Sequence, residues 1–390
     1  MDELIRLIKK TTMRVMLYPM RLLPIKKNRV VLFNNLSNTY SCNPKYIAEY
    51  LRKEYNGKFD LVYIVKDPKR YRMIKGIHFI RLNSLPYFYN VMTTKVFVTN
   101  SGGHSYFPLK NSQYVINTWH GGGAYKKAGL DMYKNAKGFR YDLKLSAAHT
   151  NVFLSTNKRF TQEISRAMVV PRGCFWEIGM PRNDMLINGA SKKAVAIRSK
   201  LGLKEDEKLV LYAPTYRKTN DNYFKDSIAI SYDIDPQMVC EALSTRFGGK
   251  WVFAIRLHPC VTNREDYQME GILDLTDYED MQELLLAADV MINDFSSSMW
   301  DFMLTKKPCF TYAKDLQHYI ATTEVYTDVA DWPFPQSTSN DELVKSILSF
   351  NESDYKRRCR QHYKELGGCE SGKATELVAK KIAKVCKITL

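Results

Sequence analysis

Residues 29–65 read RVVLFNNLSNTYSCNPKYIAEYLRKEYNGKFDLVYIV, and this stretch decides the fold. Its two ends, 29–34 and 59–65, are short apolar runs rich in Val, Ile, Phe and Tyr, which predict buried strands. Between them, 44–54 has a helical pattern, with Asn43 as the predicted N-cap and Pro44 in the first turn. A strand, a helix and a second strand in this order predict a parallel sheet with right-handed crossovers.

The same alternation continues along the chain and then restarts. Further strands are expected at 95–99, 114–118, 151–155, 208–213, 251–257 and 290–293, and helices at 158–168, 278–288 and 297–304. A polar helical stretch at about 189–203 separates the two sets of strands. We therefore expect an α/β fold with two doubly wound, Rossmann-like domains facing a cleft, and ligands at the carboxyl ends of the strands.

The chain is basic. It has 390 residues with 58 Lys and Arg against 41 Asp and Glu, a formal net charge of +17. Such an excess favours polyanionic partners, namely nucleic acid, an anionic membrane or phosphate-rich substrates, and composition alone does not choose among them. The eight cysteines form no CxxC pair and no zinc-type spacing, so free thiols in a reducing cytoplasm are expected.

Residues 1–28 predict an amphipathic helix. Positions 1, 4, 5, 8, 12, 15, 16 and 19 give one mostly apolar face, Lys and Arg occupy much of the rest, and Pro19 and Pro24 end the helix. No apolar run is long enough for a signal sequence or a transmembrane helix. A helix of this kind lies in a membrane interface, or it packs on the domain with a solvated basic face. We expect the membrane interface.

Four segments at predicted strand ends carry candidate chemistry. In 117–123 (NTWHGGG) a strand leads to His120 and three glycines, which suits a base beside a phosphate-holding loop, or a tight turn with a structural histidine. In 289–302 a strand runs into Ser296–Ser298 at a helix start, where hydroxyls and amides either bind phosphate or simply cap the helix. Arg217 and His258 follow two other predicted strands. No metal-binding, Walker A or nucleic-acid-module motif appears.

Taken together, these segments resemble the CDP-glycerol glycerophosphotransferase family of teichoic acid synthesis. The matching motifs lie in family order over about residues 30–320: 43–47 (NPKYI), 118–121 (TWHG), 126–127 (KK), 129–131 (GLD), 179–184 (GMPRND), 212–217 (YAPTYR), 257–259 (LHP) and 294–297 (DFSS). The family usually continues its Trp-His-Gly with Thr or Ser and then Pro. Here Gly122 and Gly123 stand at those positions, which leaves the exact substrate open.

The resemblance implies a GT-B-type fold in three parts: a membrane-associating segment 1–28, an acceptor domain 29–190 and a CDP-polyol donor domain 191–390, whose final helices either stay there or pack back on the acceptor domain. It implies monotopic attachment to the cytoplasmic face of the membrane. Catalytic roles are expected for His120 and for His258, the latter at the donor phosphates. The expected substrate-binding residues are Gly121, Gly122, Lys126, Arg182, Asn183, Asp184, Thr215, Arg217, Asp294, Ser296, Ser297 and Ser298.

The expected reaction transfers glycerol phosphate from CDP-glycerol to a lipid-linked acceptor, such as a polyprenyl pyrophosphate derivative, and releases CMP. No cofactor, metal or nucleic-acid partner is expected. Three alternatives stay open. In the first, the donor is CDP-ribitol. In the second, the protein is a GT-B glycosyltransferase that uses a sugar nucleotide. In the third, it is a non-catalytic basic protein, which would leave His120, His258 and the serines without a role.

Overall fold

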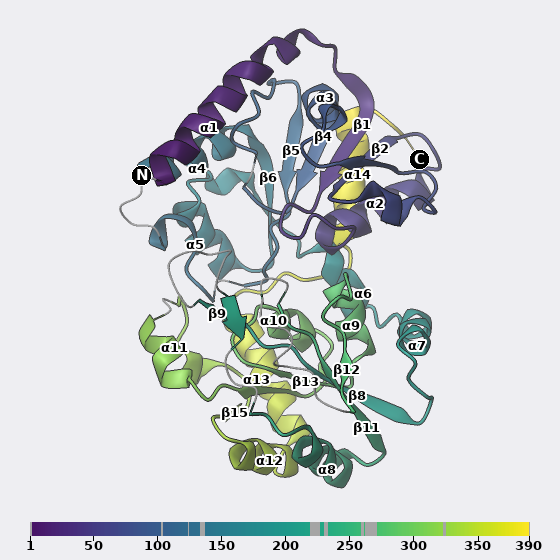
Figure 1. The fold of residues 1–390 in the computed structure, drawn as a ribbon, viewed down its shortest axis with the longest axis vertical. Helices are drawn as coiled ribbons and strands as arrows, with labels where there is room; N and C mark the ends of the chain where they lie inside the picture. The colour runs from purple at the N-terminus through teal and green to yellow at the C-terminus, as the bar shows by residue number, and fades with distance from the viewer. Residues whose placement is uncertain are drawn as a thin grey trace. The chain divides into compact units, whose positions relative to one another are not determined.

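A computed structural model describes residues 2–102, 104–123, 125–132, 137–218, 227–229, 233–258, 261, 271–322 and 325–389. The chain forms two compact units. The first unit contains residues 1–184 together with 366–390, and the second contains 185–365 (Figure 1). The first boundary falls within the short helix α6 (Asp184–Ile187). The chain thus leaves the first unit once and returns to it.

The first unit is built on a seven-stranded sheet whose neighbouring strands all pair in parallel. The strand order is β3-β2-β1-β4-β5-β6-β7. The strands are β1 (Lys26–Phe33), β2 (Asp60–Val65), β3 (His78–Arg81), β4 (Thr94–Thr99), β5 (Tyr114–Asn117), β6 (Thr150–Ser155) and β7 (Phe175–Glu177). The helices are α1 (Asp2–Leu17), α2 (Cys42–Glu54), α3 (Leu85–Thr93), α4 (Lys137–His149), α5 (Lys158–Ala167) and α14 (Ala374–Cys386), with 3-10 turns η1 (Tyr18–Leu22), η2 (Pro68–Tyr71), η3 (Gly129–Asp131), η4 (Arg172–Cys174) and η5 (Pro181–Asn183).

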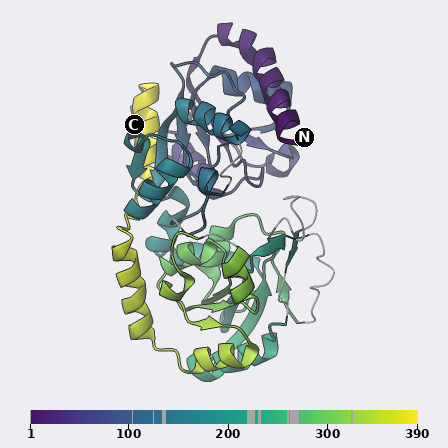
Figure 2. The same ribbon diagram turned by 90° about the vertical axis from the view of Figure 1, so that its left-hand side faces the viewer.

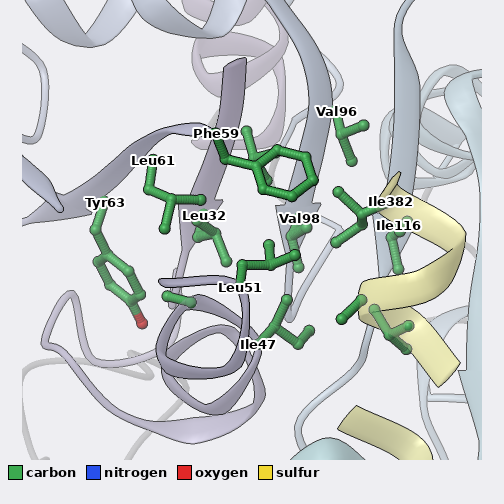
Figure 3. Close-up of a cluster of buried hydrophobic side chains, with 14 of the residues drawn as sticks. Leu32, Ile47, Leu51, Phe59, Leu61, Tyr63, Val96, Val98, Ile116 and Ile382 are labelled. Atoms are coloured by element: carbon green, nitrogen blue, oxygen red, sulfur yellow. The ribbon is translucent and has the colours of Figure 1, made fainter. Parts of the chain in front are cut away.

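Helices cover both faces of this sheet because alternate strand residues point in opposite directions. In β1, Val30 and Leu32 join a buried cluster that includes residues of α2 and α14 (Figure 3). Val31 and Phe33 join a second cluster with α3 and the end of α1. Figure 2 accordingly shows the C-terminal helix and the N-terminal helix on opposite sides of this unit. Burial on both faces explains why residues 30–33 of β1 are all apolar.

The start of α2 differs from the sequence prediction. The helix begins at Cys42, with Ser41 at the N-cap position, so Asn43 is not the cap. The side chain of Asn43 is fully buried and donates instead to the carbonyl of Trp119 at 3.0 Å. Tertiary hydrogen bonding therefore takes this amide away from the local role that its position suggested.

The N-terminal helix α1 packs on the first unit by one side only. Leu17 is buried, and Arg14 donates to the carbonyls of Ser105 at 2.9 Å and Phe107 at 3.0 Å. The opposite side is apolar and exposed: it presents Ile5, Ile8, Val15, Met16 at 69% and, beyond the helix, Leu22 at 90%. Among the described residues no helix combines the length and the apolar character needed to cross a bilayer.

The C-terminal segment is fastened to the first unit by two carboxylates. Asp184 accepts from the backbone N–H groups of Ala374 at 3.0 Å and Thr375 at 2.7 Å, which satisfies free amides at the start of α14. Glu370 accepts from the Met180 N–H at 3.1 Å and the Asn183 amide at 2.7 Å. These bonds link two segments that are about 190 residues apart in sequence.

The second unit contains a six-stranded sheet in the order β12-β11-β8-β13-β14-β15, again with parallel neighbours. Its strands are β8 (Glu207–Tyr212), β11 (Lys250–Ile255), β12 (Leu273–Asp274), β13 (Val290–Asn293), β14 (Cys309–Tyr312) and β15 (Gln336–Ser337); β9 (Tyr216–Lys218) and β10 (Ser227–Ala229) form a separate antiparallel pair. The helices are α7 (Ser191–Lys200), α8 (Pro236–Phe247), α9 (Met281–Ala287), α10 (Ser298–Met303), α11 (Leu316–Thr322), α12 (Asn340–Leu348) and α13 (Glu352–Glu365), with the 3-10 turn η7 (Val329–Asp331). Two parallel sheets confirm the predicted α/β class.

Candidate active site

Polar residues follow the central strands of the first sheet. Asn34 comes directly after β1, Asn100 after β4 and Thr118 after β5, and these three strands are neighbours. His120 lies two residues beyond Thr118. Because the strands are parallel, all four residues lie at the carboxyl edge of the sheet, where α/β proteins bind their ligands.

A backbone carbonyl fixes the hydrogen-bonding state of His120. The ring nitrogen Nδ1 lies 2.8 Å from the carbonyl oxygen of Asn100. A carbonyl oxygen can only accept, so Nδ1 carries the proton and Nε2 of the neutral ring keeps its lone pair. Burial lowers the pKa of His120 to about 4, and the charge of Arg182 adds to this effect, while the Asn100 carbonyl opposes it. At neutral pH the ring is therefore a neutral base with Nε2 unprotonated.

Trp119 holds a strained backbone conformation beside this histidine. Its φ is +53°, a region that a bulky residue rarely adopts. Its N–H donates to the side chain of Asn117 at 2.9 Å, and its carbonyl accepts from Asn43 at 3.0 Å. The indole stacks on the His120 ring, with centroids 4.5 Å apart. Hydrogen bonds on both sides of Trp119 thus impose the strained turn that places its ring against the imidazole.

Arg182, predicted to bind substrate, supports the same turn. It is buried, and its guanidinium donates to the carbonyl of His120 at 2.7 Å. The next two residues, Asn183 and Asp184, form hydrogen bonds with the C-terminal segment described above. The structure therefore brings Arg182 to His120, and gives Asn183 and Asp184 a fastening role within the fold. Their contact with substrate stays a prediction.

The glycine run after His120 contains one position that requires glycine. Gly123 has φ +74°, and a Cβ there would lie 2.1 Å from the ring of Tyr125. Its N–H donates to the hydroxyl of Thr156 at 3.0 Å. Gly121 and Gly122 precede it next to His120, and Lys126 follows with its side chain partly exposed. This close packing explains the glycine at 123 without any ligand.

The second sheet repeats the arrangement. Thr215 follows β8, His258 follows β11 and Asp294 follows β13, and these strands are neighbours with β8 in the centre. Asp294 is buried and accepts from the N–H groups of Thr215 at 2.8 Å and Phe295 at 2.5 Å. Asp294 thereby ties the two loops together. Arg217 lies in β9, and its side chain is outside the described residues.

The three serines after β13 differ in exposure. Ser298 is buried, Ser296 is partly exposed and Ser297 is exposed. Asn293 organises the turn, since its side chain donates to the Ser298 hydroxyl at 3.0 Å and accepts from the N–H groups of Asp294 at 2.7 Å and Ser296 at 3.0 Å. The helix that follows, α10, has only six residues. Ser297 is thus the serine that offers its side chain to solvent.

Sequence reasoning missed several asparagines that organise both sites. Asn34, Asn100 and Asn117 lie at strand ends of the first sheet, and Asn293 ends β13. The signal was present, because each is an amide at the carboxyl end of an apolar run. Within the described part of the chain, no group of three His, Cys, Asp or Glu residues is placed to hold a metal ion.

Two parallel α/β sheets with polar residues at the ends of their central strands are the features of a GT-B-like transferase. The sequence pattern described as CDP-Glycerol:Poly(glycerophosphate) glycerophosphotransferase matches residues 16–384. The chain belongs to this family.

Curated relatives and solved structures agree with that assignment. The chain is 28% identical to the teichoic acid poly(glycerol phosphate) polymerase of Bacillus subtilis (strain 168), over 97% of this chain and 52% of the relative. It therefore spans about half the length of that polymerase. It is 27% identical to the teichoic acid glycerol-phosphate transferase of Staphylococcus aureus, over 92% of this chain and 93% of the relative. A histidine-to-asparagine variant of the wall teichoic acid polymerase TagF, soaked with CDPG, matches with a TM-score of 0.81 and 25% identity, over 99% of this chain and 97% of that chain.

Proposed function

We propose that this protein transfers glycerol phosphate from CDP-glycerol to a hydroxyl group of a lipid-linked acceptor and releases CMP, as a step in the synthesis of a teichoic-acid-like polymer. The single observation that carries the proposal is the state of His120. Its Nδ1 is committed to the Asn100 carbonyl, so Nε2 is the nitrogen that can take a proton. Family membership supplies the reaction in which such a base is needed.

In this reaction His120 acts as the general base. Nε2 takes the proton of the acceptor hydroxyl, and the oxygen forms a bond to the phosphorus that carries glycerol. The bond from that phosphorus to the bridging oxygen breaks, and CMP leaves with the electron pair. Only an unprotonated ring can take this proton, and the low pKa of His120 keeps the ring neutral at pH 7.

Donor phosphates are proposed to lie at the strand ends of the second sheet. His258 and the exposed Ser297 follow β11 and β13 there, and Asp294 holds the intervening loops in place. Fixed polar groups aimed at a leaving phosphate stabilise the charge that develops on it. Gly121 and Lys126, which follow His120 in the sequence, are the proposed contacts to the acceptor. Arg217 and Thr215 complete the proposed donor set.

The test is CMP release by the purified protein with a lipid-linked acceptor. CDP-glycerol, CDP-ribitol and a UDP-sugar are offered in parallel, because the three donors separate the proposed function from its alternatives. Acceptor-dependent CMP release from CDP-glycerol is expected. Release only from CDP-ribitol would move the assignment to ribitol phosphate, and UDP release would move it to a glycosyltransferase.

We further propose that α1 and η1 attach the protein to the cytoplasmic face of the membrane. The exposed apolar side chains of α1 lie on the face that the sequence predicted to be apolar, while the packed side uses Arg14 and Leu17. Lys26 and Lys27 follow and are exposed. Burial of apolar side chains and attraction of lysines to anionic lipid act together at such a surface.

A further inference from the structure

We infer that Asn34 is a positioning residue for His120: it anchors the side chain of Asn100, whose backbone carbonyl orients the imidazole. This inference rests on the proposed function, in which His120 is the base. Asn34 touches no reacting atom. Its effect passes through Asn100 alone, by two consecutive hydrogen bonds: from Asn34 to the Asn100 side chain, and from the Asn100 carbonyl to His120.

The sheet register places the two asparagines opposite each other. β1 and β4 are adjacent parallel strands, with Phe33 opposite Thr99 at the end of the ladder. The next residues are Asn34 and Asn100, and both are buried, at 2% and 0% exposure. Each therefore needs partners for its amide within the protein.

Both ends of the Asn100 amide are held by residues that follow β1. Its Nδ2 donates to Oδ1 of Asn34 at 2.7 Å, and its Oδ1 accepts from the N–H of Asn35 at 2.9 Å. A residue with its side chain held at two points has little freedom to rotate its backbone. The Asn100 carbonyl consequently keeps one direction, toward Nδ1 of His120.

The orientation of Asn34 is itself specified. Its Nδ2 donates to the hydroxyls of Ser37 at 2.7 Å and Ser41 at 2.8 Å, and its Oδ1 also accepts from the N–H of Leu36 at 3.3 Å. A flipped amide would turn NH₂ toward the NH₂ of Asn100 and lose these bonds. A neutral amide fits here, since it supplies donors on one side and an acceptor on the other.

The chemical consequence concerns the tautomer of His120. Neutral imidazole carries its proton on either nitrogen, and the bond to the other nitrogen decides which. If the Asn100 carbonyl is no longer held, the form protonated on Nε2 becomes populated, and that form cannot accept the proton of an acceptor hydroxyl. Asn34 therefore controls the fraction of His120 in the Nδ1-protonated tautomer, the form whose Nε2 can accept a proton.

The experiment compares Asn34→Ala and Asn34→Asp with Gln113→Ala in the full chain. Gln113 is a matched control, because it is another buried amide of the same unit and donates to the carbonyls of Val91 at 2.8 Å and Thr94 at 3.0 Å, at the opposite end of β4 from Asn100. The readouts are kcat, the KM for CDP-glycerol, the pH profile of kcat, and the ¹⁵N chemical shifts of the His120 ring in histidine-labelled protein.

We expect Asn34→Ala to lower kcat about 10-fold, part of the about 10²–10⁴-fold that a general base contributes, with the KM for CDP-glycerol unchanged. The bond to the Asn100 carbonyl raises the pKa of His120. Loss of this bond in Asn34→Ala should therefore shift the acid limb of the kcat pH profile to lower pH. Asn34→Asp should shift the same acid limb to higher pH. The added carboxylate stabilises the imidazolium of His120, whereas the charge of Arg182 destabilises it. The nitrogen shifts should show the Nδ1-protonated form in the native protein and a mixture in Asn34→Ala.

Native kcat, pH profile and tautomer in both Asn34 variants would overturn the inference. So would the same kinetic losses in Gln113→Ala, since these would reflect general destabilisation. If the native protein releases no CMP from CDP-glycerol, the proposed function fails separately, and the nitrogen shifts still decide whether Asn34 sets the tautomer of His120.

Discussion

At the scale of single residues, His120 is the side chain on which the proposed chemistry depends. One ring nitrogen is bound to a backbone carbonyl, one ring face is covered by Trp119, and its own carbonyl is held by Arg182. These contacts restrain the imidazole without using Nε2. Removing the imidazole while keeping the turn measures what this side chain contributes to turnover.

We expect His120→Ala to reduce kcat about 10²–10⁴-fold, the usual contribution of a general base. The KM for CDP-glycerol should change little, because the proposed donor contacts belong to the second unit. CMP release in steady state measures the loss, and thermal unfolding confirms that the variant is folded. A folded variant with native turnover would remove His120 from the mechanism.

A second residue-scale prediction concerns His104, which is buried and bonded through Nε2 to the carbonyl of Ser146 at 3.2 Å. Burial lowers its pKa to about 4, against 6.5 for an exposed histidine. Between pH 6.5 and about 4, His104 is protonated in the unfolded chain but not in the folded one. Its contribution to the free energy of unfolding is therefore fully present above pH 6.5 and is lost as the pH falls toward 4. The loss from one such group is at most about 3 kcal/mol.

Urea unfolding at pH 7, 6, 5 and 4.5 measures the slope of the free energy of unfolding against pH. His104→Gln should flatten it, whatever that change costs at pH 7. A variant that retains the full slope would assign the effect to other groups, such as His120, whose pKa is lowered in the same direction.

The sequence identified His120 because it follows an apolar run and precedes glycines, which is local information. It gave Asn43 only a capping role and did not identify Asn34 or Asn100, because the roles of Asn34 and Asn100 depend on which strands are neighbours. Adjacency of β1 and β4 places residues 34 and 100 together, and no local pattern states that adjacency. The motifs therefore pointed to candidate residues in the loops after the strands, while Asn34 and Asn100, whose amides meet across two strands, were missed.

At the scale of elements, α1 shows how a helix divides between packing and exposure. Its inner side is fastened by Arg14, Leu17 and an ion pair between Lys10 and Asp142. Its apolar outer side is left open, although apolar residues at helical spacing ordinarily face a core. An exposed apolar stripe beside lysines is the pattern that marks a membrane-facing or partner-facing surface.

We expect the triple variant Ile8→Gln, Val15→Gln and Met16→Gln to weaken binding to vesicles of anionic lipid while leaving thermal stability near native. Glutamine keeps helix propensity, and the three side chains contribute little to the core. Leu17→Ala is the matched control: it should cost about 2–5 kcal/mol of stability as a buried change and leave vesicle binding intact once folded. Flotation at several salt concentrations separates apolar burial from charge attraction. Unchanged flotation of the triple variant would show that this face has another use.

Several elements of the second unit were predicted close to where they form. β13 was predicted at 290–293 and forms there, and α9 and α10 lie within their predicted ranges. The sheet strands β3, β7, β12, β14 and β15 were not predicted. Each has two to four residues, which gives little periodicity to distinguish a strand from a loop, although the equally short β13 was recognised from its apolar run. Their place in each sheet comes from pairing with longer neighbours.

At the scale of the whole molecule, the chain returns to its first unit at the end. Residues 366–390 belong with 1–184, and α14 buries Val378, Ala379 and Ile382 in the cluster that also holds α2. Local patterns do not state which core a late helix joins. The motif at 179–184 holds this segment, since Asp184 accepts from the start of α14 while Met180 and Asn183 donate to Glu370.

We expect Ile382→Ala to destabilise the first unit by about 2–5 kcal/mol and Asp184→Ala by about 0.5–2 kcal/mol, the value of a lost helix cap. Lys384→Ala, on the exposed side of α14, should change stability by less than about 0.5 kcal/mol. Chemical denaturation measures all three. A raised KM in Asp184→Ala without loss of stability would instead assign Asp184 to the substrate.

The return of α14 also sets an order of events during synthesis. Residues 185–365 leave the ribosome as one continuous stretch and can complete their sheet at once, whereas the first unit stays without one helical wall until α14 has been made. Over that interval the apolar face of β1, β2 and β4 is open to other chains, and domains usually fold in the order in which they emerge. The N-terminal unit of this protein can therefore complete its core only after the second unit has been synthesised.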